Sequence, residues 1–309
     1  MRTERLAVVV VPSYNSERTI LRCLASLAAQ QTSCPYEVIV IDSSTDSTPA
    51  LVQANFPSVS LIRGSGRLVP GAARNLGVSR AQGDVIAFLD SDCEADPTWL
   101  QRIVARIDQG YEVVGGAVAN GTPRAPIGTA DYLLTFNEFT PRAPERETNF
   151  IPSCNLACTR EAFEAVGGFP PDLVTGEDRP FGHAASRRGP LLFDPRVIVY
   201  HLNRTRFTDF LRHHYTFGVH SALVRARLAL PGSVFVRVPL LSLTLPLIRS
   251  VRVSTRLCFH GAGPALQAMF LSPLLLIGIL VWSYGFIRTA LGKPLGPGVP
   301  QSRLPGETV

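Results

Sequence analysis

The chain has 309 residues, of which 46% are hydrophobic and 17% are charged, so it can bury a large core and is not a wholly disordered chain. Its net charge of +6 is unevenly distributed, because residues 1–200 carry 18 basic and 22 acidic side chains whereas residues 201–309 carry 12 basic and 2 acidic ones. Two regions of opposite charge suggest two different roles. The only lysine is Lys293, which excludes a catalytic lysine from the first 200 residues.

The six cysteines form no CxxC pair, and this pattern is typical of a reduced, cytosolic setting. The first apolar run, Leu6–Val11, leads directly into Pro12 without a small-residue cleavage site. It is shorter than the apolar region of a signal peptide. We therefore expect the working part of the chain to stay in the cytoplasm.

Short apolar runs alternate with helical segments over the first 90 residues. The apolar runs are typical of strands that are covered on both faces. Ser16 is expected to cap the first helix, and Pro49 and Pro97 mark the starts of two more. Strands separated by helices predict a Rossmann-like α/β fold with a mostly parallel, doubly wound sheet. The predicted strands are Leu6–Val11, Val38–Ile41, Val59–Ile62 and Val85–Leu89.

Polar side chains follow three of these strands, in Pro12–Asn15, at Asp42 and in Asp90–Asp92. Ligands of such sheets bind at the carboxyl ends of the strands. Neither a GxGxxG pattern nor a Walker loop is present, so phosphates must be held in another way. Two carboxylates two residues apart at a strand end can hold Mn²⁺ or Mg²⁺, which would neutralise a departing diphosphate.

Six segments, in this order and spacing, resemble family 2 glycosyltransferases with the GT-A fold. The resemblance covers about residues 6–220. It implies an inverting transfer of a sugar from a nucleotide-diphospho-sugar donor to an acceptor hydroxyl. The segments are Val10–Asn15, Val40–Asp46, Gly71–Asn75, Phe88–Asp92, Gly167–Phe169 and Gly176–Asp178.

The resemblance also implies roles for single residues. Asp178 matches the base that removes the acceptor proton while the hydroxyl attacks the anomeric carbon, and Glu177 is the alternative base. Asp92 would be the more direct metal ligand, with Asp90 near the metal and the ribose, and His201 would be a third contact to the metal or diphosphate. The remaining donor contacts would be Pro12, Ser13, Tyr14 and Asn15 in the nucleotide pocket, Asp42 at the nucleobase, and Arg74 and Ser91.

The sequence departs from the family pattern in two places. Asp42 is followed by Ser43 rather than by a second acid, which leaves the nucleobase contact on one carboxylate. The Gln-x-x-Arg-Trp box of processive synthases is replaced by Phe210–Tyr215, which contains no tryptophan. This favours the addition of a single sugar. The histidines at 213, 214 and 220 lack HExxH spacing, so we expect no zinc site there.

The C-terminal third contains a long apolar segment. No Lys, Arg, Asp or Glu occurs from Leu257 to Ile287, and about 20 such residues suffice to cross a bilayer. The run Val238–Ile248 contains two prolines and fits an interfacial helix better. The alternative is a buried helical hairpin in a soluble protein. The predicted domains are a GT-A domain (1–228), membrane-associated helices (229–288; interfacial at 234–250, transmembrane at about 265–287) and a flexible tail (289–309).

The excess of positive charge in this third would attract anionic lipid headgroups. No nucleic-acid motif accompanies it, so we expect membrane lipids as partners and no nucleic acid. The predicted function is a glycosyltransferase at the cytoplasmic face of the cell membrane, acting on a lipid-linked acceptor or a cell-envelope glycan precursor. A sugar-phosphate nucleotidylyltransferase is one alternative, which the lack of lysine argues against. A non-catalytic membrane scaffold is the other, which the intact Asp90, Asp92 and Asp178 argue against.

Overall fold

A computed structural model describes residues 5–228 and 230–292 and divides the chain into two compact units. The first unit comprises residues 5–121, 139–171 and 177–202, and the second comprises the described residues of 122–138, 172–176 and 203–292. The domain boundaries expected from the sequence remain predictions. The expected flexible tail lies outside the described residues from 293 onward, and its described part is helical up to Ala290.

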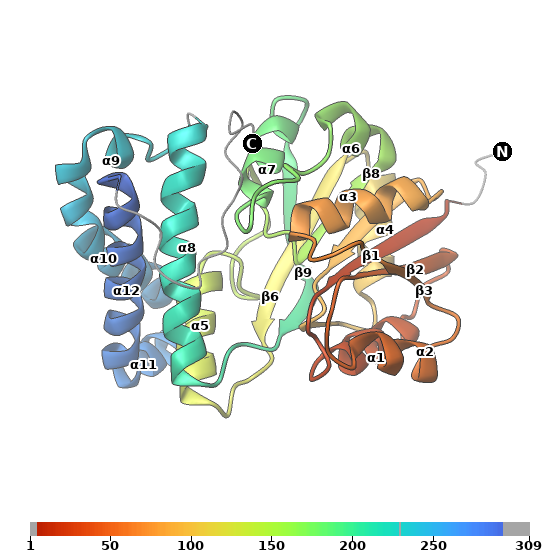
Figure 1. The fold of residues 1–309 in the computed structure, drawn as a ribbon, viewed down its shortest axis with the longest axis horizontal. Helices are drawn as coiled ribbons and strands as arrows, with labels where there is room; N and C mark the ends of the chain where they lie inside the picture. The colour runs from red at the N-terminus through yellow and green to blue at the C-terminus, as the bar shows by residue number, and fades with distance from the viewer. Residues whose placement is uncertain (1–4, 229, 293–309) are drawn as a thin grey trace. The chain divides into compact units, whose positions relative to one another are not determined.

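A nine-stranded sheet forms the first unit (Figure 1). Its four predicted strands pair in parallel in the order β3-β2-β1-β4, as the alternation of strands and helices predicts. These strands are β1 (Ala7–Ser13), β2 (Tyr36–Asp42), β3 (Ser60–Arg63) and β4 (Val85–Leu89). Beyond β4 the sheet is mixed. Strand β8 (Asn155–Thr159) is antiparallel to β4 and to β6 (Val113–Asn120), which is parallel to β9 (Leu191–His201). Two short strands, β5 (Cys93–Ala95) and β7 (Arg146–Thr148), are antiparallel to β9.

Helices cover both faces of this sheet, with α3 on the opposite side of β1 and β2 from α1 and α2 (Figure 1). The expected Ser16 cap is wrong, because α1 begins at Ile20 and the Ser16 hydroxyl lies 2.7 Å from that of Ser91 instead. Pro49 lies in the first turn of α2, as predicted, whereas α4 begins at Trp99, two residues after Pro97. The helices are α1 (Ile20–Ala28), α2 (Thr48–Asn55), α3 (Pro70–Arg80), α4 (Trp99–Asp108), α6 (Arg160–Val166) and α7 (Asp178–Ala185).

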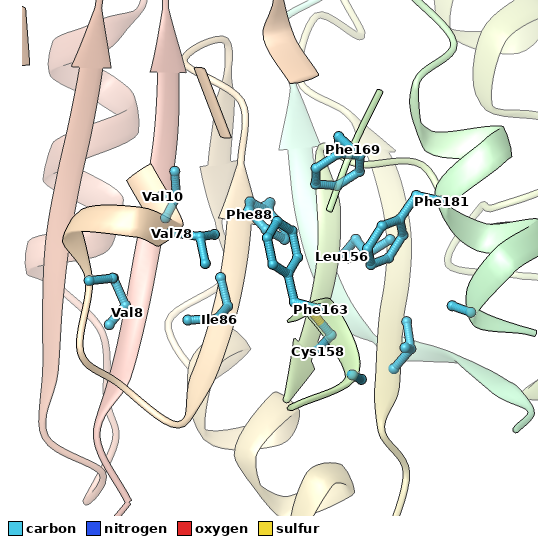
Figure 2. Packing of buried hydrophobic residues seen from close by; sticks show 14 of the residues in the cluster. Val8, Val10, Val78, Ile86, Phe88, Leu156, Cys158, Phe163, Phe169 and Phe181 are labelled. Atoms are coloured by element: carbon cyan, nitrogen blue, oxygen red, sulfur yellow. The ribbon is translucent and has the colours of Figure 1, made fainter. Parts of the chain in front are cut away.

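An aromatic cluster joins the sheet to the helices on the α3 side (Figure 2). Phe88 of β4 meets Phe169 edge-on at a centroid distance of 5.1 Å, and Phe169 stacks on Phe181 of α7 at 4.6 Å. Phe163 of α6 lies 5.9 Å from both Phe169 and Phe181. All four rings are buried, and each such pair contributes about 0.5–1.5 kcal/mol beyond the burial of area. The cluster therefore fixes α7 against β4.

The second unit is helical. Its longest helices, α8 (Phe207–Arg227) and α12 (Ser272–Ala290), lie side by side (Figure 1). A Cβ at Gly218 of α8 would overlap the carbonyl oxygen of Trp282, so the two backbones are in contact. Small residues permit this close packing. The other helices are α5 (Pro126–Phe136), α9 (Val234–Arg237), the 3₁₀ helix η1 (Pro239–Thr244), α10 (Leu245–Phe259) and α11 (Ala262–Phe270).

Among the described residues, α12 is the one helix whose length and composition would allow it to cross a membrane, and 39% of its apolar window is buried in the protein. The predicted span of about 265–287 covers parts of two helices, because α11 ends and α12 begins on either side of Leu271. The predicted interfacial segment 234–250 comprises α9, η1 and the start of α10. Crossing of a membrane remains a prediction.

Candidate active site

Side-chain hydrogen bonds join the loops that follow β1, β2 and β4. The Asn15 Oδ1 atom accepts from the Thr45 N–H at 2.9 Å, and the Asn15 N–H donates to the Ser44 hydroxyl at 2.7 Å. Asn15 has a positive φ of 52°, a conformation that asparagine tolerates better than most residues. The 2.7 Å contact between Ser16 and Ser91 ties the first loop to the third. The three polar segments expected at the strand ends therefore lie at one edge of the sheet.

Asp42 ends β2 beneath this edge, and its side chain has no exposed surface. Its Oδ1 accepts from the Ser44 hydroxyl at 2.6 Å, its Oδ2 accepts from the Ser44 N–H at 3.2 Å, and Arg63 forms an ion pair with Oδ2. The Arg63 side chain is 46% exposed and covers the carboxylate from outside. A nucleobase would reach Asp42 only after Arg63 moves, so the expected nucleobase contact stays a prediction.

A single buried guanidinium connects two acidic segments of the site. Arg74 of α3 is 1% exposed, and its Nη1 donates to Glu177 Oε1 at 2.5 Å while its Nη2 pairs with Asp90 Oδ1. The Ser153 hydroxyl also lies 3.4 Å from Glu177 Oε1. Since Arg74 is enclosed by these carboxylates, it is placed to position them rather than to contact a donor directly.

The backbone of α3 lies against the loop that precedes α7, which puts Arg74 in this position. A Cβ at Gly71 would lie 2.5 Å from the carbonyl oxygen of Pro170, so only glycine allows this approach. Asn75 binds the backbone of Phe169 twice, accepting from its N–H at 2.9 Å and donating to its carbonyl at 2.7 Å. The Gly71–Asn75 motif thus has a positioning role in the structure.

Glu177 and Asp178 differ in their surroundings. Glu177 is buried and is neutralised by Arg74. Asp178 opens α7 and is partly buried. Burial, reinforced by the neighbouring Glu177 carboxylate, raises the pKa of Asp178 to about 7, although Arg179, Arg74 and the Ser153 N–H act in the opposite direction. A carboxylate with a pKa near neutrality suits a general base, so of the two acids Asp178 has the better chemistry.

Asp92 lies beside His201 because β5 pairs with β9 in a register that sets Cys93 opposite His201. The His201 Nε2 atom lies 3.6 Å from Asp92 Oδ1, and the Cys93 sulfur lies 4.0 Å from the same oxygen. Within the described residues, these three side chains form the one grouping of three metal-ligating side chains whose ligand atoms all lie within 4.8 Å of one another. A carboxylate and an imidazole fit a divalent cation such as Mn²⁺. Of the expected metal residues, Asp92 and His201 are brought together, whereas Asp90 is paired with Arg74.

The predicted nucleotide segment carries an unsatisfied group. The hydroxyl of Ser13 is buried and has no hydrogen-bond partner within the described part of the chain. Buried polar groups without partners are uncommon and require a reason, such as a ligand. Tyr14 is exposed, and the Arg67 guanidinium lies 4.5 Å from the centre of its ring. Pro12 lies in β1 and is partly buried.

A second ionisable cluster lies in the helical unit around Asp131 of α5. Its Oδ1 atom is 3.1 Å from His214 Nε2 and 3.9 Å from His213 Nε2, and Arg204 lies 3.4 Å from Oδ2. Although burial opposes the change, His213, His214 and Arg204 hold the pKa of Asp131 well below its usual range.

A hollow of about 370 Å³ in the same unit is lined by residues of the α5 and α11 regions and has no carboxylate in its lining. Neither this cluster nor this hollow contains any of the residues expected to bind the donor or the metal.

Comparison with known proteins shows the family of the chain. Residues 8–167 match the family model described as "Glycosyl transferase family 2". Glycosyltransferase AglE of Haloferax volcanii is 29% identical over 217 residues, which cover 68% of this chain and 71% of that protein. The pre-mycofactocin glycosyltransferase of Mycobacterium tuberculosis is 24% identical over 73% of this chain but only 48% of its own length.

Among solved structures, the mannosyltransferase PcManGT from Pyrobaculum calidifontis, in complex with GDP-Man and Mn²⁺, superposes with a TM-score of 0.60. It is 20% identical, and the match covers 95% of this chain and 89% of that one. At this identity the likeness shows the fold, which is GT-A. Because the family model spans more than half of the chain, the protein belongs to glycosyl transferase family 2 and is a glycosyltransferase.

Proposed function

We propose that the protein transfers a single sugar, with inversion, from a nucleotide-diphospho-sugar to an acceptor hydroxyl, using the acidic edge of its sheet. The observation that carries this proposal is that the buried guanidinium of Arg74 links the carboxylates of Asp90 and Glu177. Asp178, whose pKa is raised, follows Glu177 directly. The family match favours sugar transfer over the nucleotidylyltransferase alternative.

Asp178 would accept the proton of the acceptor hydroxyl as that oxygen attacks the anomeric carbon, while the nucleoside diphosphate leaves from the opposite side. Proton transfer of this kind contributes about 10²–10⁴-fold to a rate. Glu177 would keep its charge paired with Arg74 throughout and would hold α7, and so Asp178, in place. The helix N-terminus is a rigid mount for the base.

Asp92 and His201 would hold a divalent cation, as their 3.6 Å separation allows. A bound Mn²⁺ or Mg²⁺ would supply neutralisation of the charge that develops on the leaving diphosphate. PcManGT, which shares the fold, was solved with GDP-Man and Mn²⁺. Asp90 would lie near the ribose, the Pro12–Asn15 segment and Ser91 would contact the nucleotide, and Asp42 would contact the base after Arg63 has moved.

The acceptor would be a lipid-linked molecule or a cell-envelope glycan precursor, met at the cytoplasmic face of the cell membrane. This part of the proposal is supported by the basic C-terminal third and by the apolar helix α12. The absence of the processive Gln-x-x-Arg-Trp box in Phe210–Tyr215 favours one sugar per acceptor.

The test is transfer of radiolabelled sugar from UDP-, GDP- and dTDP-sugars, with Mn²⁺ and the full chain, to two acceptor fractions, a lipid extract of bacterial membranes and the water-soluble glycans of the same cells. At least one donor should label the extract. Asp178→Asn should reduce that label by about 10²-fold or more. Asp108→Asn is the matched control, because Asp108 is an exposed acid on α4 that pairs with Arg5, and it should retain activity.

Equal transfer by the wild type and by Asp178→Asn would contradict the assignment of the base. Label that stays with a water-soluble glycan would contradict the lipid-linked acceptor and leave the chemistry of the site intact. A chain that transfers no sugar from any of the three donors would favour the scaffold alternative.

A further inference from the structure

The helical unit exposes an unusual amount of apolar surface. Of the nineteen large hydrophobic side chains that are exposed in the described part of the chain, sixteen lie between residues 234 and 291. Helix α11 has no buried residue, although most of its side chains are apolar. We use "apolar surface" for eight side chains of η1, α10 and α11 that are each more than half exposed: Leu240, Leu243, Leu247, Val251, Phe259, Leu266, Met269 and Phe270.

The spacing of these residues shows that the exposure is ordered. On α10, Leu245, Val253 and Leu257 are buried, while Leu247 and Val251 lie one turn apart on the outward side. Exposed apolar patches of this kind mark interaction sites, because soluble proteins rarely leave them uncovered. The apolar surface therefore needs a cover that the protein's own described residues do not provide.

The charges around the apolar surface indicate what kind of partner can cover it. No Asp or Glu occurs between residues 210 and 306. Arg237 and Arg252 are exposed beside the apolar residues, whereas Arg249 stacks on Trp282 at 3.9 Å and Arg256 pairs with Glu138 at 2.7 Å. Two copies of a surface with only positive charges would repel each other, so a second copy is a poor cover. An anionic lipid surface matches both the arginines and the apolar residues.

The packing of α12 indicates how the unit meets the lipid. Helix α12 touches α8 through backbone at two points, Gly218 against Trp282 and Gly285 against Tyr215. Helix α8 carries Arg212, which is 75% exposed, and ends in Arg225 and Arg227. Crossing of a bilayer by α12 would therefore require either the burial of this charged helix in lipid or the loss of a close helix pair.

We infer that the protein docks in the plane of an anionic membrane through the apolar surface, with α12 kept packed against α8 in the helical unit rather than spanning the bilayer. The inference refines the membrane attachment in the proposed function. The fifteen residues of α10 span about 22 Å, less than the roughly 30 Å of a hydrocarbon core, which agrees with a helix lying in the interface.

Vesicle flotation of the purified full chain, without donor or acceptor, tests the docking. We expect the protein to float with vesicles of phosphatidylcholine plus phosphatidylglycerol, and the bound fraction to fall with salt and in pure phosphatidylcholine. Leu247→Glu and Phe259→Glu should each lower the partition coefficient by about tenfold or more. Ala54→Glu, which adds the same charge on exposed α2 in the first unit, should float like the wild type.

The ends of α12 test the topology. In a background with both Cys34→Ser and Cys258→Ser, which removes the two cysteines that are not buried, Ser272→Cys and Leu291→Cys are placed at the two ends of the helix, and a membrane-impermeant maleimide is added to sealed inside-out membrane vesicles. Both variants should be labelled without detergent if α12 stays on one side. Labelling of one end alone would overturn the in-plane arrangement.

Two further results would overturn the docking proposal. One is flotation that Leu247→Glu and Phe259→Glu leave unchanged while both variants melt like the wild type. The other is a wild-type dimer that these variants convert to a monomer without a change in flotation, because a second copy would then cover the apolar surface. Neither assay depends on sugar transfer, so failure of the proposed reaction would be seen separately.

Discussion

Arg74 is the residue on which the candidate site depends most directly. It is enclosed and pairs with two acids from different segments, Asp90 after β4 and Glu177 before α7. Removing one member of a buried ion pair leaves the remaining charge uncompensated. Arg74→Met should therefore lower the free energy of unfolding by about 3 kcal/mol or more, measured by denaturant titration. Arg74→Lys should recover part of this loss, and a variant as stable as the wild type would contradict the buried bridge.

The same substitution has a second expected effect, which a purely structural role would not produce. The positive charge of Arg74 lowers the pKa of Asp178. In Arg74→Met we expect the acidic limb of the pH profile of kcat/KM to move to higher pH. A profile that loses height but keeps its midpoint would show that Arg74 does not act on the base.

Ionisation of Asp178 should make both activity and stability depend on pH. Because the pKa of Asp178 is raised to about 7 and the base must be ionised, kcat/KM should rise with pH up to about 7 and then level off.

The stability of the fold should also depend on the ionisation of Asp178. The carboxyl group of Asp178 has its ordinary pKa of 3.8 in the unfolded chain and therefore holds its proton more tightly in the folded chain. The stability contributed by Asp178 thus falls as pH rises from about 4 to about 7. Asp178→Asn should therefore raise the melting temperature more at pH 8 than at pH 4. An equal shift at both values would contradict the raised pKa.

Sequence alone could identify acids at the strand ends but not their partners. The resemblance placed Asp92 and His201 in one expected metal site, but what brings the two side chains to 3.6 Å is the pairing of β5 with β9. The ion pair between Arg63 and Asp42 was not predicted. Arg63 lies opposite Asp42 in the pairing of β2 with β3, and the register of two strands depends on how they pack. Cys93 was missed for a similar reason, since its place depends on an antiparallel pairing with β9.

At the scale of elements, long apolar runs were the most predictable features. The strands β1 to β4 occur close to where their apolar residues indicate. The prediction that Ser16 caps α1 was wrong, because the Ser16 hydroxyl bonds to Ser91 in a distant loop instead. The break at Leu271 was also missed, although Pro273 in the first turn of α12 is a sequence signal for the start of a helix.

The contact between α8 and α12 leads to a prediction at this scale. Gly218→Ala would place a Cβ against the carbonyl oxygen of Trp282, which backbone movement must relieve. The gain in helix propensity is about 1 kcal/mol, whereas overpacking costs about 1–3 kcal/mol, so we expect net destabilisation of the helical unit in thermal melts. Gly263→Ala in α11 is the control, because a Cβ there meets nothing within 4 Å, and it should be neutral or stabilising. Equal melting of both variants would contradict the tight helix pair.

At the scale of the whole molecule, the α/β class and the GT-A fold followed from the alternation of strands and helices and from the six motifs. The two compact units did not, because α5 comes from the middle of the chain and belongs to the helical unit with α8 to α12. The composition of α5 does not show that this segment leaves the first unit and packs in the second. The contrast in charge between the first 200 residues and the remainder is evident in the sequence, and it agrees with the proposed division into a catalytic sheet edge and a lipid-facing surface.

The central claim is that the acids at one rim of the sheet bind a nucleoside diphosphate through a divalent cation. Calorimetric titration of the full chain with UDP, GDP and dTDP, with and without Mn²⁺, tests it most directly. We predict that at least one nucleotide binds about tenfold or more tightly with Mn²⁺, a difference of about 1.4 kcal/mol, and that Asp92→Asn removes this difference. Binding that is equally tight without the metal, or a metal effect that survives in Asp92→Asn, would contradict the account.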